Sequence, residues 1–424
     1  MPPTFLPSTL IRRAKILSQF VSAQLVVQAL GFTSGILLVR TLEQQQYAYF
    51  TIANTMQATM NVLADMGIGS GLSVIGGKVW QDQYRFGQLI NTAMQLRRYL
   101  AVIAIIVVTP ILLWLLISNG ISIVYATLII VIVLVEFNFR LTTGVLVVVP
   151  RLHSQINRLQ SLELIFAASR LCMLSFAYLT YLNAAVALIA STVASGLQRL
   201  LIGYWVTDNV NNKASVQPKD REEILKLVKS QAPYFIFYCI QGQFTIWLIS
   251  ILGNTQSIAE VGALGRLGVL LAVIGSVMSS IIAPSFARCQ SVNQLRFRYF
   301  QTIGLFIFFS LFLIGFAALF PRELLWILGE KYAHLESELV FMAGNSMIKS
   351  LASIMISLNS SKGWIKNSWI IVPSTIVTQF ITITLVQVST VKKIFIFEIL
   401  SMLPTIFINA FMTYRGLYED KKSD

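Results

Sequence analysis

Twelve apolar runs dominate this chain of 424 residues, and each is long enough to cross a bilayer as a helix. A helix needs about 20 apolar residues to span the ~30 Å hydrocarbon core, and the polar segments between the runs are short. Hydrophobic residues form 56% of the chain and charged residues only 12%, a balance that excludes a soluble globular protein. We therefore predict an all-α integral membrane protein whose spans lie near residues 16–39, 49–75, 99–118, 121–149, 161–182, 184–206, 233–253, 258–284, 299–320, 338–358, 366–387 and 394–414.

The placement of the charges orients the chain in the membrane. The formal net charge is +14, and 22 of the 32 Lys and Arg residues fall in segments on the same side as the N-terminus. Only five fall in segments on the other side, and the rest lie within the apolar runs. Because cytoplasmic loops carry an excess of cations, both termini are predicted to be cytoplasmic, with an even number of spans. This bias explains the net charge without a nucleic-acid partner.

The cysteine and histidine residues give no sign of a metal, disulfide or cofactor site. Cys172, Cys239 and Cys289 are scattered along the chain, and His153 and His334 are isolated. We therefore predict no cofactor.

Charged residues inside the apolar runs are the strongest functional signal in the sequence. An ionised side chain at the bilayer centre costs on the order of 2.5–3.5 kcal/mol on insertion scales, so such residues usually face a bundle interior or a hydrated cavity. In the run 121–149, Glu136 and Arg140 are one helical turn apart and share a face. We predict that the intramembrane cations line a path for an anionic substrate; they are Arg140, Arg170, Arg199, Arg266 and Lys349.

Two of these cations have alternative explanations. Arg199 lies near the inner end of its span, where its side chain could snorkel to the membrane interface. Lys349 has no acid within one helical turn, so we expect it either to be deprotonated or to pair with a distant acid.

Polar side chains recur at helical spacing on several predicted spans. Steps of three or four residues place them on one face of each helix, which we expect to turn toward a polar cavity. Amides and small residues also let membrane helices pack closely, so a purely structural role stays open. The predicted cavity-lining residues are Gln24, Gln28, Asn54, Asn61, Tyr238, Gln241 and Asn345.

Two carboxylates lie deep in the apolar runs. Asp65 ends the polar stripe of the run 49–75, and Glu136 precedes Arg140 by one turn. Each could bind a coupling proton or sodium ion, or serve as a structural counter-charge for an intramembrane arginine. Because the intramembrane cations outnumber these two acids, the predicted core is positively charged.

The longest polar segment divides the chain near its centre. Its DREE sequence at 220–223 is a capping-box pattern that predicts a short helix with an apolar stripe. We expect a cytoplasmic interfacial linker helix at 207–232 between a six-helix bundle at 1–206 and a second at 233–424. The similar spacing of the runs suggests that the halves are related by a pseudo-two-fold axis along the membrane normal.

Short motifs mark corresponding places in the two halves. The first half contains LVRTL at 38–42, YAY at 47–49 and LADMGIG at 63–69. The second half contains EVGALGRL at 260–267 and PSFAR at 284–288. Together these segments resemble the polysaccharide flippases of the multidrug/oligosaccharidyl-lipid/polysaccharide (MOP) exporter superfamily.

The resemblance implies a bacterial inner-membrane flippase built from two six-helix bundles. Such a protein moves an undecaprenyl-diphosphate-linked oligosaccharide, for example an O-antigen or capsule repeat unit of lipopolysaccharide or capsule biosynthesis, from the cytoplasmic to the periplasmic leaflet. It would work by alternating access, contact membrane lipids and associate with polysaccharide polymerase machinery. Family members are thought to use a cationic central cavity, for which Arg140, Arg170, Arg266 and Lys349 are the candidates here.

Other functions remain open. A cation-coupled drug or metabolite exporter of the same superfamily should show an excess of buried carboxylates, whereas the predicted core is cationic. A membrane glycan polymerase or glycosyltransferase usually has a large extramembrane loop or an acidic metal-binding pair, and this sequence contains no Asp-x-Asp. Flippases of the peptidoglycan precursor look like fourteen-span proteins, whereas twelve runs fit here. We therefore predict a carrier and not an enzyme.

Overall fold

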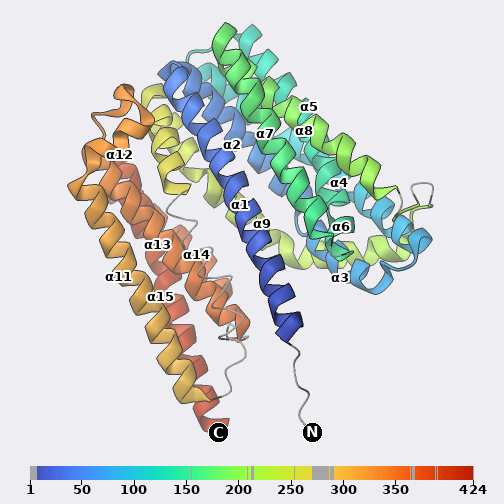
Figure 1. Cartoon of the computed structure of the whole chain (residues 1–424). Coiled ribbons are helices and arrows are strands. Elements are labelled where there is room, and N and C mark those ends of the chain that lie inside the picture. Colours follow the sequence, from blue (N-terminus) through green and yellow to red (C-terminus); the bar gives the residue numbers. More distant parts are fainter. Residues whose placement is uncertain are drawn as a thin grey trace. The chain divides into compact units, whose positions relative to one another are not determined.

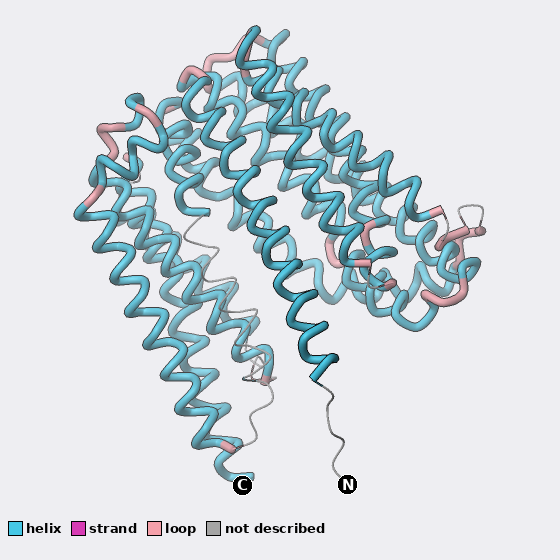
Figure 2. Tube along the Cα trace, in the orientation of Figure 1, coloured by secondary structure: helices cyan, strands magenta, loops and turns pink. Residues whose placement is uncertain are grey.

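The computed structural model describes residues 7–153, 155–207, 209–211, 214–252, 254–269, 286, 291–362, 364, 368–386, 388 and 390–423. In this part of the chain every regular element is a helix (Figures 1 and 2). Contacts divide the chain into two compact units, Met1–Ile246 and Trp247–Asp424, so that the division falls inside the long helix α9 (Pro218–Leu252). The prediction that one bundle ends at residue 206 and the second begins at residue 233 stays a prediction.

Unit 1 consists of long helices that pack side by side. In addition to the first part of α9, they are α1 (Pro7–Thr41), α2 (Gln44–Asp65), α3 (Ile68–Val79), α4 (Gln83–Ser118), α5 (Ile123–Leu146), α6 (Val148–Leu152), α7 (Ile156–Thr180) and α8 (Ala184–Val206). α5 packs along α8, α2 along α4, and α1 along α7 (Figure 1). α4 also contacts α5, and α7 contacts α8, so these helices form one continuous bundle.

Side-chain caps fix where three of these helices begin. Asp82 accepts two hydrogen bonds from backbone N–H groups in the first turn of α4. Ser122 accepts one such hydrogen bond at the start of α5, and Asn183 accepts one at the start of α8. Such residues satisfy N–H groups that have no partner inside the helix, so they begin helices readily.

The run predicted as one span at 49–75 is divided in the structure. α2 ends at Asp65, and Met66 and Gly67 have left-handed backbone angles, with φ of 36° and 93°. This conformation ends a helix because it turns the chain away from the helical path, and glycine adopts it without steric cost. α3 begins directly afterwards, so the single predicted span is two helices.

The linker helix predicted at 207–232 is also not a separate element. Helical backbone continues from Pro218 through position 233 to Leu252, so the capping-box sequence begins one long helix, α9. Sequence alone placed a boundary at Pro233, where a proline commonly begins a helix.

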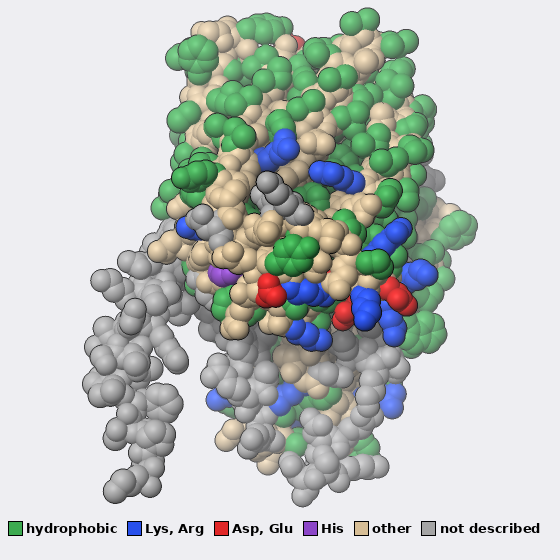
Figure 3. Space-filling model, turned by 90° about the vertical axis from the view of Figure 1, so that its right-hand side faces the viewer, with side chains coloured by type: hydrophobic (Ala, Val, Ile, Leu, Met, Phe, Trp, Pro, Cys, Tyr) green, Lys and Arg blue, Asp and Glu red, His purple; other side chains and the backbone are tan. Residues whose placement is uncertain are grey.

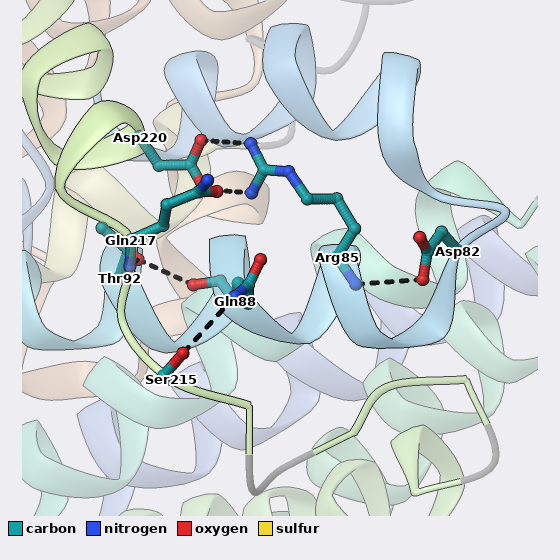
Figure 4. A network of polar contacts seen from close by, with 7 residues as sticks. All are labelled: Asp82, Arg85, Gln88, Thr92, Ser215, Gln217 and Asp220. Atoms are coloured by element: carbon teal, nitrogen blue, oxygen red, sulfur yellow. Dashed lines mark hydrogen bonds and ion pairs between the residues drawn. The ribbon is translucent and has the colours of Figure 1, made fainter.

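The start of α9 is fixed to α4 by a polar network (Figure 4). Arg85 donates two hydrogen bonds to the buried carboxylate of Asp220, at 2.5 and 2.6 Å. The backbone N–H of Gln217 donates to the hydroxyl of Thr92 at 3.0 Å. A Cβ at Gly87 would collide with the backbone of this connection, so glycine permits the close approach.

Unit 2 is a second helical bundle. Besides the helix over residues 255–269, it contains α11 (Val292–Leu319), α12 (Pro321–Leu328), η1 (Glu330–Tyr332), α13 (Glu336–Ser361), η2 (Ser368–Ile370), α14 (Ile371–Val386) and α15 (Val391–Ser423). α13 and α14 both pack along α15. A buried network joins α13 to α15: Asn359 donates to the side chain of Asn409 at 3.0 Å and accepts from Thr413 at 2.7 Å.

The surface suits a membrane protein. Eight helices of the described part are long and apolar enough to span, and the shorter apolar segments Ile240–Ile251 and Ile371–Val386 add to them. The predicted run 258–284 is described only up to residue 269. Figure 3 shows a mainly apolar area above a band of Lys and Arg side chains. Exposed cations in the segments predicted to be cytoplasmic include Lys78, Arg98, Arg151, Lys219 and Arg221.

Candidate functional site

Unit 1 contains two adjoining pockets, which we call the Arg140 pocket and the Arg170 pocket. Their volumes are about 480 Å³ and 310 Å³, and Gln198 of α8 lines both. The Arg140 pocket is lined by Asn54, Gln57, Ala58, Asn61, Arg140, Thr143, Gly144, Val147 and Gln198. The Arg170 pocket is lined by Gln24, Val27, Gln28, Gly31, Ser34, Glu163, Phe166, Ala167, Arg170 and Gln198.

Helical spacing explains which residues line the Arg140 pocket. From α2 it takes residues 54, 57, 58 and 61, and from α5 it takes residues 140, 143 and 144, followed by residue 147 directly after the helix end. Residues three and four apart lie on the same side of a helix, so each helix presents a single face. Both Asn54 and Asn61 were predicted to line a polar cavity, and the structure brings them together with Arg140.

Arg140 is held by a buried carboxylate. Its Nε donates to Oε1 of Glu136 at 2.8 Å, as the four-residue spacing predicts, and the same oxygen accepts a hydrogen bond from Ser195 of α8 at 3.1 Å. The Glu136 side chain is 1% exposed, whereas that of Arg140 is 38% exposed. Because Glu136 engages Nε, the four N–H groups at the end of the guanidinium are not used by this pair. Glu136 therefore neutralises and orients Arg140, which supports its interpretation as a counter-charge.

The Arg170 pocket continues the polar region along α1 and α7. Gln24 and Gln28, one helical turn apart on α1, line it together with Arg170 of α7. Phe166 lines this pocket, and its ring centroid lies 5.2 Å from Cζ of Arg140, a distance typical of a cation–π contact. Phe166 and Gln198 therefore connect the two pockets.

Two residues of α8 differ from the prediction. Gln198 lines both pockets but was not predicted, although its neighbour Arg199 was. The Cζ of Arg199 lies 5.5 Å from the ring centroid of Phe139, and Arg199 does not line either of these two pockets. The sequence does contain a signal for Gln198, because Ser191, Ser195 and Gln198 are spaced by four and three residues and therefore lie on one face of the helix.

Asp65 pairs with an arginine that the sequence placed outside the membrane. Its Oδ1 lies 3.8 Å from Nη1 of Arg97 on α4. The predicted span at 99–118 leaves Arg97 in the polar connector before it, but Arg97 is 7% exposed, and α4 already begins at Gln83. Arg97 is therefore a buried residue of a long helix and not part of a separate connector.

Lys349 in unit 2 pairs with a distant acid, one of its two predicted alternatives. Its Nζ donates to Oε2 of Glu398 on α15 at 2.9 Å, and Asn345, one turn earlier on α13, donates to the same oxygen. Glu398 was not among the predicted deep acids, although it lies within the predicted span 394–414. The predicted excess of positive charge in the core is smaller for this reason.

The remaining candidates lie elsewhere in the chain. Arg266 is partly buried in the helix 255–269 of unit 2, and Gln241 is partly buried in α9. The side chain of Tyr238 lies outside the described residues. Within the described part, no group of three His, Cys, Asp or Glu side chains is placed to hold a metal ion.

Solved transporters share this fold. An inward-facing multidrug resistance transporter of the MATE family of the MOP superfamily superposes with a TM-score of 0.77 at 17% identity, covering 94% of this chain and 96% of that chain. The lipid II flippase MurJ, in an inward closed conformation, gives a TM-score of 0.73 at 13% identity, covering 92% and 87%. A MOP superfamily transporter from Pyrococcus furiosus, described as having a binding pocket of reversed polarity, gives 0.65 at 14% identity, covering 95% and 93%.

These likenesses establish the fold of the chain. No protein-family model matches it, and no characterised protein matches it by sequence. The fold is that of MOP superfamily transporters, and the chain is a multi-pass membrane protein. The predicted fold class is thereby confirmed.

Proposed function

We propose that this chain is a flippase of the bacterial inner membrane. It moves an oligosaccharide linked to undecaprenyl diphosphate, such as an O-antigen or capsule repeat unit, from the cytoplasmic to the periplasmic leaflet by alternating access. It works without chemical change to the cargo and with both termini in the cytoplasm. The observation that carries the proposal is the pair of adjoining pockets, which present Arg140 and Arg170 among amide side chains.

The pocket residues match the two polar parts of this cargo. A guanidinium binds phosphate oxygens through paired, charge-assisted hydrogen bonds, and Arg140 keeps four N–H groups for this purpose. The amides of Asn54, Asn61 and Gln198 can donate to sugar hydroxyls and accept from them. Pockets of about 300–1,000 Å³ hold small ligands, so both volumes suit a head group whose polyprenyl tail stays in lipid.

Two solved proteins with this fold bear on the choice of cargo, and the first of them supports a lipid-linked one. One is described as a lipid II flippase, and another as a transporter whose binding pocket has reversed polarity. A fold that hosts such different pockets leaves the choice of cargo to the side chains that line them. We also propose association with polysaccharide polymerase machinery, which would receive the delivered unit.

Transport in proteoliposomes tests the proposal. With a fluorescent undecaprenyl-diphosphate oligosaccharide, Arg140→Ala should lower the flux on the order of 10- to 100-fold, because a hydrogen bond to a charged group contributes about 1.5–3 kcal/mol. Arg140→Lys should lie between Arg140→Ala and the wild type, since lysine keeps the charge and loses the paired geometry. The exposed Arg151→Ala variant is the control and should match the wild type. A folded wild-type protein that gives no flux above protein-free vesicles would contradict the proposal.

A cation-coupled drug or metabolite exporter is the second candidate. Carboxylates favour it, because Glu136 is buried beside Arg140, Glu163 lines the Arg170 pocket and Glu398 pairs with Lys349. Several solved proteins with this fold are MATE multidrug transporters. Export of an organic cation driven by a proton or sodium gradient, lost in Glu163→Gln and retained in Arg140→Ala, would favour this candidate over the flippase.

A further inference from the structure

We propose that Arg97 is a further substrate-binding residue of the Arg140 pocket, and that it makes the site selective for a diphosphate over a monophosphate. The inference rests on the proposed function, because it concerns how the same pocket reads its lipid-linked cargo. It is carried by the position of Arg97 behind Gly144, by its burial and by its incomplete set of polar partners.

Arg97 occupies the place where a side chain at position 144 would be. A Cβ built on Gly144 would collide with Nη1 of Arg97, and would stand 2.8 Å from both Cζ and Nη2. Gly144 itself lines the pocket. The guanidinium of an α4 residue therefore takes the space of the missing side chain at a position of α5 that lines the pocket.

This placement puts a second guanidinium against the wall of the pocket. Arg140 and Gly144 both line the pocket and are four residues apart on α5, so their positions on the helix surface are neighbours. Glu136 holds the Arg140 guanidinium through Nε, and the Arg97 guanidinium lies against Gly144, behind the residues that line the pocket. Two cations at neighbouring positions of one helix suit two linked phosphate groups, and each guanidinium can bind one of them through paired hydrogen bonds.

Arg97 is buried without a full set of partners. It is 7% exposed, and its Nε makes no hydrogen bond within the described part of the chain. Its ion pair with Asp65, at 3.8 Å, is longer than a hydrogen bond. A buried cation with so few partners is costly, and an anion bound at Gly144 would supply the missing contacts.

Asp65 holds Arg97 while the pocket is empty. Its side chain is 32% exposed, and its Oδ1 also accepts a hydrogen bond from the backbone N–H of Gly69 at 3.3 Å. A bound diphosphate would compete with this carboxylate for Arg97. Removing the charge in Asp65→Asn should therefore strengthen diphosphate binding, in the opposite direction to the loss of Arg97.

Native mass spectrometry of the full chain tests the inference with two lipids that share one tail. The protein is incubated with an equimolar mixture of undecaprenyl diphosphate and undecaprenyl monophosphate, and the ratio of the two bound forms is read directly. The wild type should favour the diphosphate about tenfold, a difference equivalent to ~1.4 kcal/mol. Arg97→Gln should bring the ratio near one, and Asp65→Asn should raise it above the wild-type value.

Two further variants separate binding from folding. Gly144→Ala keeps every charge and displaces the Arg97 guanidinium, so it should also lower the ratio. The exposed neighbour Arg98→Gln is the matched control and should keep it. A general folding defect would reduce both bound forms together and leave their ratio unchanged.

If the wild type binds neither lipid, the proposed function fails together with the inference. If the wild type prefers the diphosphate and both Arg97→Gln and Gly144→Ala keep that preference, the role of Arg97 alone is overturned.

Discussion

Glu136 carries a buried negative charge that neighbouring side chains compensate. One of its oxygens receives hydrogen bonds from Arg140 on the same helix and from Ser195 on α8, while Oε2 has no hydrogen-bond partner among the described residues. A buried carboxylate is stable only while such partners remain, because an uncompensated ion in an apolar environment is costly. This one residue therefore both fixes α5 against α8 and sets the position of the Arg140 guanidinium.

Replacing this carboxylate should weaken the bundle. Glu136→Gln keeps the size of the side chain but removes its charge, so we expect the free energy of unfolding to fall by about 1–3 kcal/mol. The loss should be smaller than for a fully buried ion pair, because Arg140 is partly exposed to solvent. Thermal unfolding in detergent measures this loss as a lower Tm. Glu163→Gln, which changes an exposed carboxylate of the Arg170 pocket, is the control and should shift stability by less than about 0.5 kcal/mol. A Tm equal to that of the wild type would show that Glu136 does not stabilise the α5–α8 contact.

At the scale of elements, the break between α2 and α3 and the attachment of α9 to α4 both depend on local backbone chemistry. The break needs two residues in a left-handed conformation, at Met66 and Gly67. The attachment needs a close approach at Gly87 and the paired hydrogen bonds between Arg85 and Asp220 (Figure 4). Each feature places functional side chains: the break places Asp65 beside Arg97, and the attachment fixes the helix that carries Arg97.

The glycine at the α2–α3 break should be sensitive to substitution. Gly67→Ala introduces a Cβ at a φ of 93°, where L side chains are strained by about 1–2 kcal/mol, so it should lower the Tm. Gly77→Ala, within α3 and with open space around the added Cβ, is the comparison. It should leave the Tm unchanged or raise it, because alanine stabilises a helix by up to ~1 kcal/mol relative to glycine. If Gly67→Ala behaved like Gly77→Ala, the left-handed turn would not be a feature of the folded protein.

For the whole molecule, the proposed function raises the question of how charge would cross the membrane with the cargo. An inside-negative potential favours outward movement of an anion by about 2.3 kcal/mol per elementary charge per 100 mV. If the diphosphate moves without a compensating ion, flux from the cytoplasmic to the periplasmic side should increase with an inside-negative potassium diffusion potential and decrease when the potential is reversed. Vesicles at zero potential provide the reference for both directions. Flux that is independent of the potential would show that a counter-ion moves with the cargo.

Periodicity allowed much of the fold and part of the site to be predicted. Spacing of three and four residues identified Gln24, Gln28, Asn54 and Asn61, because residues on one helix face share an environment whatever the tertiary structure. Contacts between helices distant in sequence were not predictable in the same way. The pair of Lys349 with Glu398 joins α13 to α15 across 49 positions, and neither helix alone indicates it.

The failures at element boundaries have a related cause. A hydrophobic run shows that a segment is buried or in lipid, but not where the backbone turns within it, so the break at Met66 and Gly67 was missed. Arg97 was misplaced because its basic neighbours suggested a solvated connector, whereas the helix begins fourteen positions earlier, at Gln83. The role proposed for Arg97 depends on the missing side chain at position 144, which matters only once α4 and α5 are packed together.

The bare backbone at position 144 gives this membrane protein a simple route for evolutionary change. Any larger residue there must push Arg97 aside. A single substitution at position 144 would therefore displace this cation and leave every charged residue of the sequence unchanged. Selection for less acidic cargo would be expected to act at this position early. Sequence variation at 144 among descendants of the same ancestor should therefore follow the charge of what each of them carries.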